Sequence, residues 1–481
     1  MTVAARVASG DDVDLQDVLA AIEAELDAAK IPGLELAVVR DGAALFAGGL
    51  GVRGVDDPSP VASATLFHHG SCGKAYTGLL AALLAADGVV DLDAPVRRYV
   101  PELRLPDPVI ADRVTLRDVL CHRSGLGRHD LAWIFNPTWS PEQIVTRLEH
   151  LPLVGDLRAQ WSYSNFGFAL AGLALGRAAG TSWETEIHRR VLEPLGMART
   201  RLTAKGMAED ADHATPHLLR DGVAKPTVFR LLNGIAPAGE VASCAEDSVR
   251  WLRAQLCDGP LDSDAVKLAQ TPFMLVPAGA APFPELEFTG YGLGWISGRY
   301  RDRPLIWHNG GVDGFSTQTL LLPADRIGIV ASANLFPTNV SLAVVLDIAD
   351  HLLGVAGDES WCERLRAADS SSPEVPDQPA PASSAPSSPA HEPADYAGEF
   401  VNGGYGRLEV LLDGDRLRAR IGEFDLDARH RHFETWDLRY DALDADLTLT
   451  FVTLSDGRVQ EALVEVESET VRFRREEAPQ P

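Results

Sequence analysis

The stretch "HHGSCGKAYTG", residues 68–78, places a serine and a lysine three residues apart at the start of a predicted helix. Side chains at this spacing lie on one helix face, so Ser71 and Lys74 are expected to meet. A serine hydroxyl becomes a nucleophile when a neighbouring base takes its proton. A desolvated lysine amine can be that base, whereas arginine stays protonated. Only five of the 43 basic residues are lysines, so Lys74 departs from the chain's usual choice of arginine. An N-cap serine followed by a surface lysine is the competing interpretation.

The stretch "WSYSNFGF" carries a second candidate pair, Tyr163 and Asn165, just before a helical pattern. A tyrosine beside a cationic lysine can act as a phenolate base, and an asparagine can hold both a substrate amide and the lysine. Taken alone, this pair also fits helix capping and a half-buried aromatic ring.

The stretch "IWHNGGVDGF" contains the third candidate group, a strand that ends in His308, Asn309, Gly310 and Gly311. Glycines on a strand let a ligand lie against the backbone, and a free N–H group there can complete an oxyanion hole. Taken alone, the group also fits a strand end followed by a glycine turn.

The three groups occur in the order Ser-x-x-Lys, Tyr-x-Asn, His-x-Gly, and together they resemble the serine β-lactamase-like and penicillin-binding-protein-like superfamily. The resemblance is to its class C β-lactamase, D-aminopeptidase and family VIII esterase side. It extends over residues 15–365 and includes three further stretches: "VTLRDVLCHRSGLGRHDLAW", "LEPLGMARTRL" and "APAGEVASCAEDSVRWL".

The resemblance implies a role for each residue of the three groups. Ser71 is the acylated nucleophile, and Lys74 and Tyr163 share proton transfer, with the choice of base left open. His308 stands where many relatives have the lysine of Lys-Thr-Gly, a replacement typical of the esterase and peptidase side. Backbone N–H groups of Ser71 and Gly311 form the oxyanion hole. The expected catalytic residues are Ser71, Lys74, Tyr163 and His308, and the expected substrate-binding residues are Asn165, Asn309, Gly310 and Gly311.

Neighbouring cysteine and histidine residues are expected to be structural. Cys72 is interpreted as a small buried residue whose thiol points away from Lys74. His68 and His69 are expected to line or support the pocket. The histidines of "HRSGLGRHD", at positions 122 and 129, are expected to hold a loop.

The elements that must position these residues show both periodicities in the first 360 residues. Helical spacing predicts helices over 75–86, 166–179 and 342–353, and two short strands flank the turn at Asp41-Gly42. Strand patterns return between residues 291 and 334. Strands at both ends of a helical middle predict an α+β domain, one antiparallel sheet with an inserted helical subdomain. The resemblance implies the β-lactamase/DD-peptidase-like fold.

A Pro-, Ser- and Ala-rich segment separates this domain from a β-rich tail. We expect a catalytic domain at 1–368, a linker at 369–393 and a small domain at 394–478. Alternating strands punctuated by Asp-Gly turns at 413–414 and 456–457 predict a barrel or small sandwich. The tail resembles the lipocalin-like module of some family members. Truncation after about residue 368 is expected to leave a folded domain.

Composition restricts the partners. The net charge of −26 argues against nucleic acid or an anionic membrane surface. No apolar run is long enough for a spanning helix, the N-terminus has no signal-like apolar region, and the five cysteines lack metal-ligand spacing. We therefore expect a cytoplasmic protein without metal or cofactor, acting on a small-molecule or peptide substrate. Its oligomeric state stays open.

The activity implied by the resemblance is a serine acyl-enzyme hydrolase acting on ester or amide/peptide substrates, including peptides with D-residues. Three alternatives stay open. The first is a penicillin-binding-protein-type thioesterase that releases and cyclises nonribosomal peptides from a peptidyl thioester. The others are a β-lactamase or DD-carboxypeptidase, whose expected export signal is missing, and a non-catalytic binding protein on the same fold.

Overall fold

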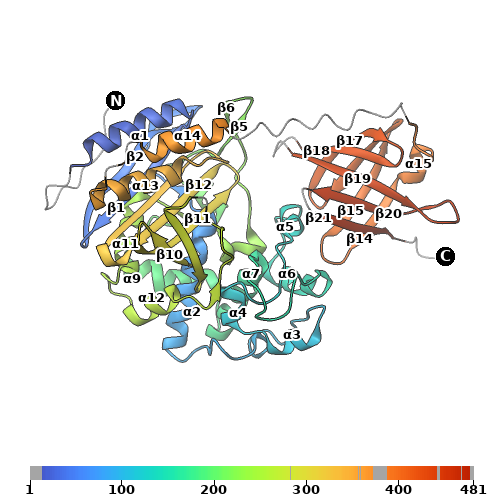
Figure 1. The fold of residues 1–481 in the computed structure, drawn as a ribbon. Coiled ribbons are helices and arrows are strands. Elements are labelled where there is room, and N and C mark those ends of the chain that lie inside the picture. Colours follow the sequence, from blue (N-terminus) through green and yellow to red (C-terminus); the bar gives the residue numbers. More distant parts are fainter. Residues whose placement is uncertain are drawn as a thin grey trace.

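The computed structural model describes residues 14–281, 283–355, 357, 359–371, 387–440, 445–466 and 469–476. An α+β domain formed by the first part of the chain lies beside a β-barrel formed by the last part (Figure 1).

The centre of the α+β domain is one antiparallel sheet of nine strands in the order β3-β2-β1-β13-β12-β11-β10-β9-β8. Strands from the two ends of the domain meet where β1 pairs with β13, with Leu34 opposite Ala333. This confirms the predicted sheet completed by both ends of the domain. The strands of this sheet are β1 (Gly33–Arg40), β2 (Ala43–Gly54), β3 (Asp57–Pro60), β8 (Met274–Leu275), β9 (Leu286–Tyr291), β10 (Ile296–Tyr300), β11 (Arg303–Val312), β12 (Phe315–Leu322) and β13 (Ile327–Ala333).

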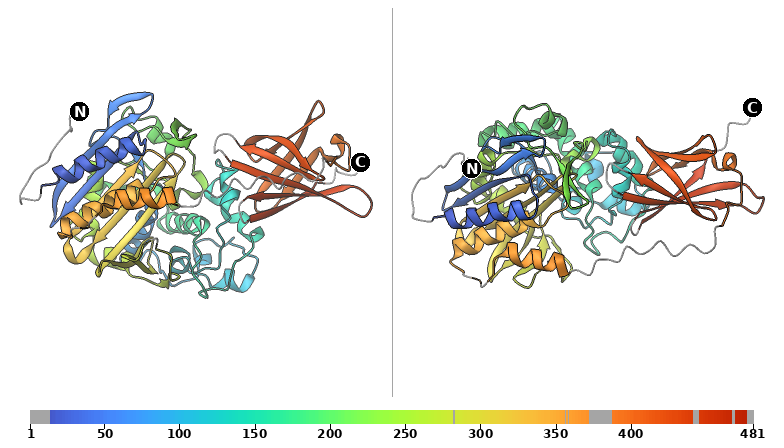
Figure 2. Two further views of the ribbon diagram at one scale, coloured as in Figure 1. Left: turned by 45° about the horizontal axis from the view of Figure 1, so that its top comes forward. Right: turned by 90° about the horizontal axis from the view of Figure 1, so that it is seen from above.

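Helices cover both faces of the sheet (Figures 1 and 2). One face carries α1 (Gln16–Ala28), α13 (Val340–Leu353) and α14 (Trp361–Ser371). The other face carries α2 (Lys74–Ala86), α11 (Ala245–Gln255) and α12 (Ser263–Gln270). The inserted helical part contains α3 (Pro108–Arg113), α4 (Leu116–Leu120), α5 (Asp130–Ile134), α6 (Pro141–Arg147), α7 (Asn165–Ala179) and α8 (Trp183–Ile187). The short strand β4 (Phe67–His68) leads into the Ser-x-x-Lys turn and pairs with β7 (Ala242–Ser243).

The turn that carries Ser71 is tighter than predicted. Residues Gly70–Gly73 form a 3₁₀ turn, and α2 begins only at Lys74. Side chains at i and i+3 eclipse in a 3₁₀ turn, which brings the amine of Lys74 directly to the hydroxyl of Ser71. The helix behind this turn is held in the core, where Tyr76 stacks on Trp251 with ring centroids 3.7 Å apart.

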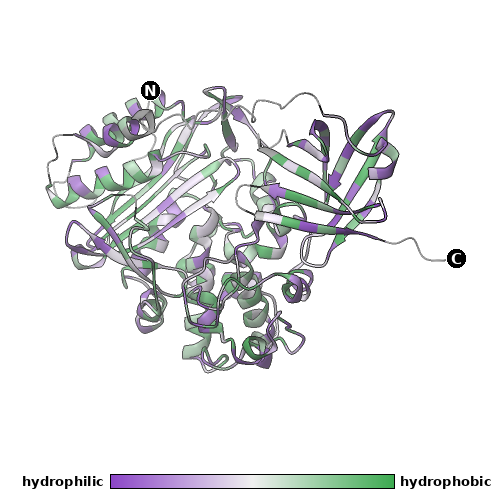
Figure 3. Cartoon of the chain, turned by 45° about the vertical axis from the view of Figure 1, so that its right-hand side comes forward, coloured by the Kyte–Doolittle hydropathy of each residue, from purple (hydrophilic) through white to green (hydrophobic). Residues whose placement is uncertain are grey.

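The tail forms a closed antiparallel barrel of eight strands in sequence order, which fits the predicted lipocalin-like domain. Its strands are β14 (Gly398–Asn402), β15 (Gly406–Asp413), β16 (Arg416–Ile421), β17 (Phe424–His432), β18 (Thr435–Tyr440), β19 (Ala445–Thr453), β20 (Val459–Val466) and β21 (Glu469–Arg475). Hydrophobic and hydrophilic residues alternate along the barrel strands (Figure 3), and in β16 the apolar residues are buried while the arginines between them are exposed. Closure by β14 and β21 pairs both edge strands.

The barrel packs on the segment 129–151 of the helical part. The His129 ring hydrogen-bonds the Tyr405 hydroxyl across the interface at 2.8 Å, and the backbone N–H of Glu423 donates to the carbonyl of Phe135. The buried apolar residues of the barrel belong to the same cluster as those of the helical part and one face of the sheet. The two parts are therefore packed against each other, although the predicted linker falls largely on residues 372–386, outside the described residues.

No helix in the described part of the chain has the length and apolar character needed to cross a membrane.

Candidate active site

Ser71 and Lys74 meet as the spacing predicts. Lys74 is fully buried, and its Nζ lies 3.0 Å from Ser71 Oγ, 2.8 Å from Asn165 Oδ1 and 2.7 Å from the carbonyl oxygen of Ala238. Desolvation lowers the pKa of this amine well below its ordinary value.

The three contacts of Lys74 are not equivalent. The Ala238 carbonyl can only accept a hydrogen bond, and the Asn165 amide is oriented with its oxygen toward Lys74 because its Nδ2 donates to Asp130 at 2.9 Å. A neutral amine has two hydrogens and one lone pair. These two acceptors take both hydrogens, and the lone pair then faces Ser71 Oγ. The arrangement can receive the hydroxyl proton of Ser71.

Tyr163 is the second group in contact with Ser71. Its hydroxyl hydrogen-bonds with Ser71, and Lys74 Nζ lies 4.7 Å from the centre of its ring. Burial raises the pKa of the Tyr163 hydroxyl, so the phenol keeps its proton at neutral pH. His122 packs on this ring with centroids 4.5 Å apart, and its Nδ1 accepts from the backbone N–H of Ser164. The loop histidine thus supports Tyr163.

His308 lies behind Tyr163, and both of its ring nitrogens are engaged. Nδ1 donates to the carbonyl of Asn309 at 2.6 Å, since a carbonyl can only accept. Nε2 consequently accepts from the hydroxyl of Tyr291 at 2.8 Å. Burial lowers the pKa of His308 to about 3, so the ring is neutral around pH 7.

Close backbone packing aligns the turn Gly70–Gly73, called the nucleophile turn after the role expected of Ser71, with β11. Gly70 has a left-handed φ of 52°, and a Cβ there would lie 3.0 Å from the nitrogen of Gly311. A Cβ on Gly310 would come within 1.9 Å of the carbonyl oxygen of His69. The first N–H groups of a helical turn have no partner within it. Because Gly70 packs on Gly311, the backbone nitrogen of the next residue, Ser71, lies close to that of Gly311. Two N–H groups that converge at this place would form an oxyanion hole.

Cys72 behaves as a structural residue. Its thiol donates to the carbonyl of His308 at 3.4 Å, and burial raises its pKa to about 12. The side chain is thereby directed at β11 rather than at Lys74.

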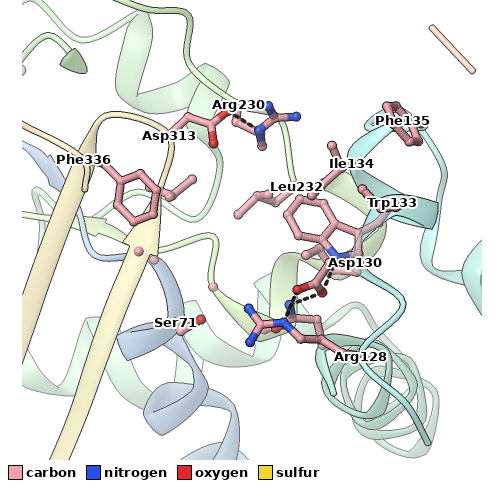
Figure 4. A pocket seen from close by; sticks show the side chains of 18 of the residues that line it. Ser71, Arg128, Asp130, Trp133, Ile134, Phe135, Arg230, Leu232, Asp313 and Phe336 are labelled. Carbon is pink, nitrogen blue, oxygen red and sulfur yellow. Dashed lines mark hydrogen bonds and ion pairs between the residues drawn. The ribbon is translucent and has the colours of Figure 1, made fainter. Parts of the chain in front are cut away.

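Ser71 opens into a cavity of about 660 Å³ (Figure 4). Most of the lining is apolar, and part of it comes from the barrel. The apolar lining side chains include Leu131, Trp133, Ile134, Phe135, Leu218, Leu232, Ile235, Val312, Phe336, Pro337 and Leu447. Tyr440 at the end of β18 and Leu447 on β19 are the barrel's contributions.

Two ion pairs stand on opposite sides of this cavity (Figure 4). On one side Asp130 accepts from Arg128 and from the indole N–H of Trp133 at 2.8 Å. On the other side Arg230 is paired with Asp313, and both side chains are largely buried. Arg230 also hydrogen-bonds Tyr440 of the barrel. Each pair is neutral as a unit, so the cavity offers local charges without a net charge.

The structure brings together most of the residues expected from the sequence. Ser71, Asn165 and Gly311 line the cavity, and Lys74, Tyr163 and His308 support it from behind. Asn309 is not among the residues that line this cavity; it lines another of about 570 Å³ near α13 and α14, which Gly310 and Gly311 also border.

Several residues of the site had no role in the sequence interpretation. Asp130, Arg230 and Asp313 enter it only through tertiary contacts. Their signal in the sequence is weak: Asp130 follows "GRH", and one residue, Val312, separates Asp313 from the glycine pair.

Comparisons with known proteins identify the family and the fold. The family model described as Beta-lactamase matches residues 19–352, and a model described as a domain of unknown function, DUF3471, matches residues 382–477. Among curated proteins, the Unguisins hydrolase ungD' of Aspergillus campestris is 27% identical over 447 residues, covering 85% of this chain and 79% of the relative.

Solved structures show the same fold. The octameric penicillin-binding protein homologue from Pyrococcus abyssi superposes with a TM-score of 0.65 at 21% identity, covering 96% of this chain and 99% of that one. A D-stereospecific amidohydrolase from Streptomyces sp. has a TM-score of 0.57 at 25% identity, covering 70% of this chain and 99% of that one.

Proposed function

Because the chain belongs to the Beta-lactamase family and is a serine hydrolase, we propose that it hydrolyses amide bonds in peptides, including bonds at D-residues. The observation that carries the proposal is the position of Ser71 and its desolvated lysine at the base of a large, mostly apolar cavity. Such a cavity suits an acyl group with apolar side chains. The similarity to a D-stereospecific amidohydrolase supports an amide substrate, and the similarity to an Unguisins hydrolase supports hydrolysis.

In the proposed reaction, Ser71 Oγ attacks the amide carbonyl while Lys74 takes the hydroxyl proton. The N–H groups of Ser71 and Gly311 stabilise the negative charge on the carbonyl oxygen. Lys74 then gives the proton to the leaving nitrogen, the C–N bond breaks, and an ester to Ser71 remains. A water molecule that loses its proton to Lys74 attacks this ester. The acid leaves, and the proton returns to Ser71.

The remaining site residues receive supporting roles in this proposal. Tyr163, protonated at neutral pH, hydrogen-bonds Ser71 and holds its hydroxyl in position for proton transfer to Lys74. His308, neutral and doubly hydrogen-bonded, holds β11 and the Tyr163 ring in place rather than moving protons. Asn165 orients Lys74 and, since it lines the cavity, contacts the substrate amide. Gly310 lets β11 approach the nucleophile turn, and Asn309 remains outside the assignment.

The test is mass spectrometry on peptide amides that differ only in the D- or L-configuration of the acyl residue. We expect release of the free acid, faster for the D-peptide, and no reaction with Ser71→Ala. Loss of the leaving group without gain of water would instead identify an amine acceptor and favour the cyclising thioesterase. If no amide, ester or thioester reacts in a Ser71-dependent manner, the proposal is refuted.

A further inference from the structure

We propose that Glu35 and His69 are positioning residues for the oxyanion hole. They form a buried pair beneath the nucleophile turn and fix the peptide groups that present the Ser71 N–H beside the Gly311 N–H. The inference rests on the proposed acyl-enzyme chemistry at Ser71, and it adds two residues that do not touch the substrate.

The side chains of the pair are enclosed in the core. His69 is 3% exposed and Glu35, in the interior strand β1, is 1% exposed. His69 Nε2 donates to Glu35 Oε2 at 2.8 Å, and Ser248 of α11 donates to Glu35 Oε1 at 2.7 Å. Both carboxylate oxygens are thus occupied, which offsets the cost of burying the group. These contacts tie His69, two residues before Ser71, to strand β1 of the sheet and to α11.

The backbone of His69 is where three segments meet. Its N–H donates to the carbonyl of Val241 at 2.8 Å, and its carbonyl accepts from the N–H of Cys72 at 3.2 Å. Gly310 lies against the same carbonyl, with room for no Cβ. Rotation of this peptide group would therefore displace the nucleophile turn relative to β11.

Gly70, the residue after His69, connects the His69 peptide group to the oxyanion hole. Gly70, at a φ of 52°, packs on the backbone of Gly311, and its N–H donates to the Nδ1 of His68 at 3.1 Å. The N–H of Ser71 follows directly. An oxyanion donor must lie within a few tenths of an ångström of its position, and a misplacement of about 1 Å costs on the order of 10²-fold in rate. A side chain that fixes the His69 peptide consequently affects the transition state more than substrate binding.

The experiment compares Glu35→Met, which removes both acceptors at similar volume, with Glu35→Gln. The glutamine keeps one acceptor oxygen for His69, carries no charge, and presents an NH2 group that can donate to the Ser248 hydroxyl. Glu25→Met is the matched control. Glu25 is also a buried carboxylate in an ion pair, with Arg366, but it lies on α1 on the opposite face of the sheet. The readouts are burst and steady-state rates with p-nitrophenyl acetate, the affinity for phenylboronic acid, which forms a tetrahedral adduct with serine, and the urea midpoint.

We expect Glu35→Met to slow acylation and deacylation by about 10- to 100-fold, because both steps pass through an oxyanion. KM should stay within twofold, boronate affinity should fall in parallel, and Glu35→Gln should recover to within about fivefold of the wild type. Equal rate losses in Glu35→Met and Glu25→Met, tracking the loss of folded protein, would overturn the inference, as would unchanged rates.

If Glu35→Met does not fold, Ser248→Ala carries the test, since it removes one hydrogen bond from Glu35 and leaves the pair intact. A threefold or larger loss of acylation rate and boronate affinity supports the inference, and a smaller change overturns it. The proposed function fails separately: a wild-type protein that forms the boronate adduct and hydrolyses the ester but cleaves no peptide amide refutes that substrate and leaves the positioning role standing.

Discussion

In the proposed mechanism, replacing Lys74 by arginine removes the base while keeping a positive charge and hydrogen-bond donors. In the wild type, the carbonyl of Ala238 and the amide oxygen of Asn165 take two hydrogens of the amine, and its lone pair faces Ser71. A guanidinium retains donors for both acceptors but has no lone pair to offer. Lys74→Arg therefore separates base catalysis from electrostatic stabilisation.

The expected loss follows from the role of the base. General base catalysis contributes about 10²–10⁴-fold in rate, which corresponds to about 3–5 kcal/mol of barrier. The kcat/KM of the wild type should rise with pH as Lys74 loses its proton, and the inflection should lie below the usual lysine pKa because burial lowers it. Lys74→Arg should lose both the rate and this rising limb.

The assay is p-nitrophenyl ester hydrolysis from pH 5 to 9, with intact-protein mass spectrometry to count acylated Ser71. Lys205→Arg is the matched control, since that side chain is 77% exposed. Tyr163→Phe should lose less activity than Lys74→Arg and keep the rising limb, because its phenol is protonated. A folded Lys74→Arg protein with activity within tenfold of the wild type and the same pH profile would refute Lys74 as the base.

Three further perturbations test other parts of the structure. One carboxylate oxygen of Glu240 accepts from the N–H of Ala204, and burial raises the pKa of this carboxyl from 4.5 to about 7. Between these two pH values the folded state binds a proton that the unfolded state has lost. The free energy of unfolding should therefore fall by up to about 3 kcal/mol as the pH rises from 4.5 to 7. Urea denaturation across this range should show the slope, and Glu240→Gln should abolish it. Arg230→Met leaves Asp313 buried without its partner and should lower the free energy of unfolding by about 3–5 kcal/mol, measured by urea denaturation. Adding Asp313→Leu should restore most of this stability. If the two substitutions instead lower the free energy of unfolding additively, the pairing is contradicted. A chain ending at residue 368 should still fold, as measured by circular dichroism. It should turn over esters more slowly and discriminate less between short and long peptides in competition kinetics. Unchanged kinetics would exclude a role of the barrel in the site.

Local patterns were sufficient to predict the elements that carry the catalytic groups. Helical spacing predicted helices over 75–86 and 166–179, and the structure has them at Lys74–Ala86 and Asn165–Ala179. Asp-Gly pairs predicted the hairpins that join β15 to β16 and β19 to β20. The 3₁₀ geometry at Ser71 was not predicted, because it depends on the close approach of Gly70 to β11 rather than on its own sequence.

Pairings between distant residues were beyond the sequence. Glu35 is an acidic residue within the apolar strand "LELAVV", and this alone indicates a buried partner. Nothing in the pattern says that the partner is His69, 34 positions away, rather than an arginine elsewhere. Asp130 and Arg230 are equally unremarkable in sequence, since charged loop residues usually face solvent. Their contribution depends on how the loops cross the cavity.

The position of the barrel predicts two distinct effects on catalysis. Tyr440 and Leu447 form part of the cavity wall, so we expect the barrel to limit the length of the acyl group. The barrel also holds the segment that orients the base: Tyr405 bonds the ring of His129, and the next residue, Asp130, fixes the amide of Asn165 that faces Lys74. Loss of the wall alone would change the preference for long substrates and spare small esters. Loss of the hold on Asp130 would slow small esters as well, so the rate with p-nitrophenyl acetate separates the two effects.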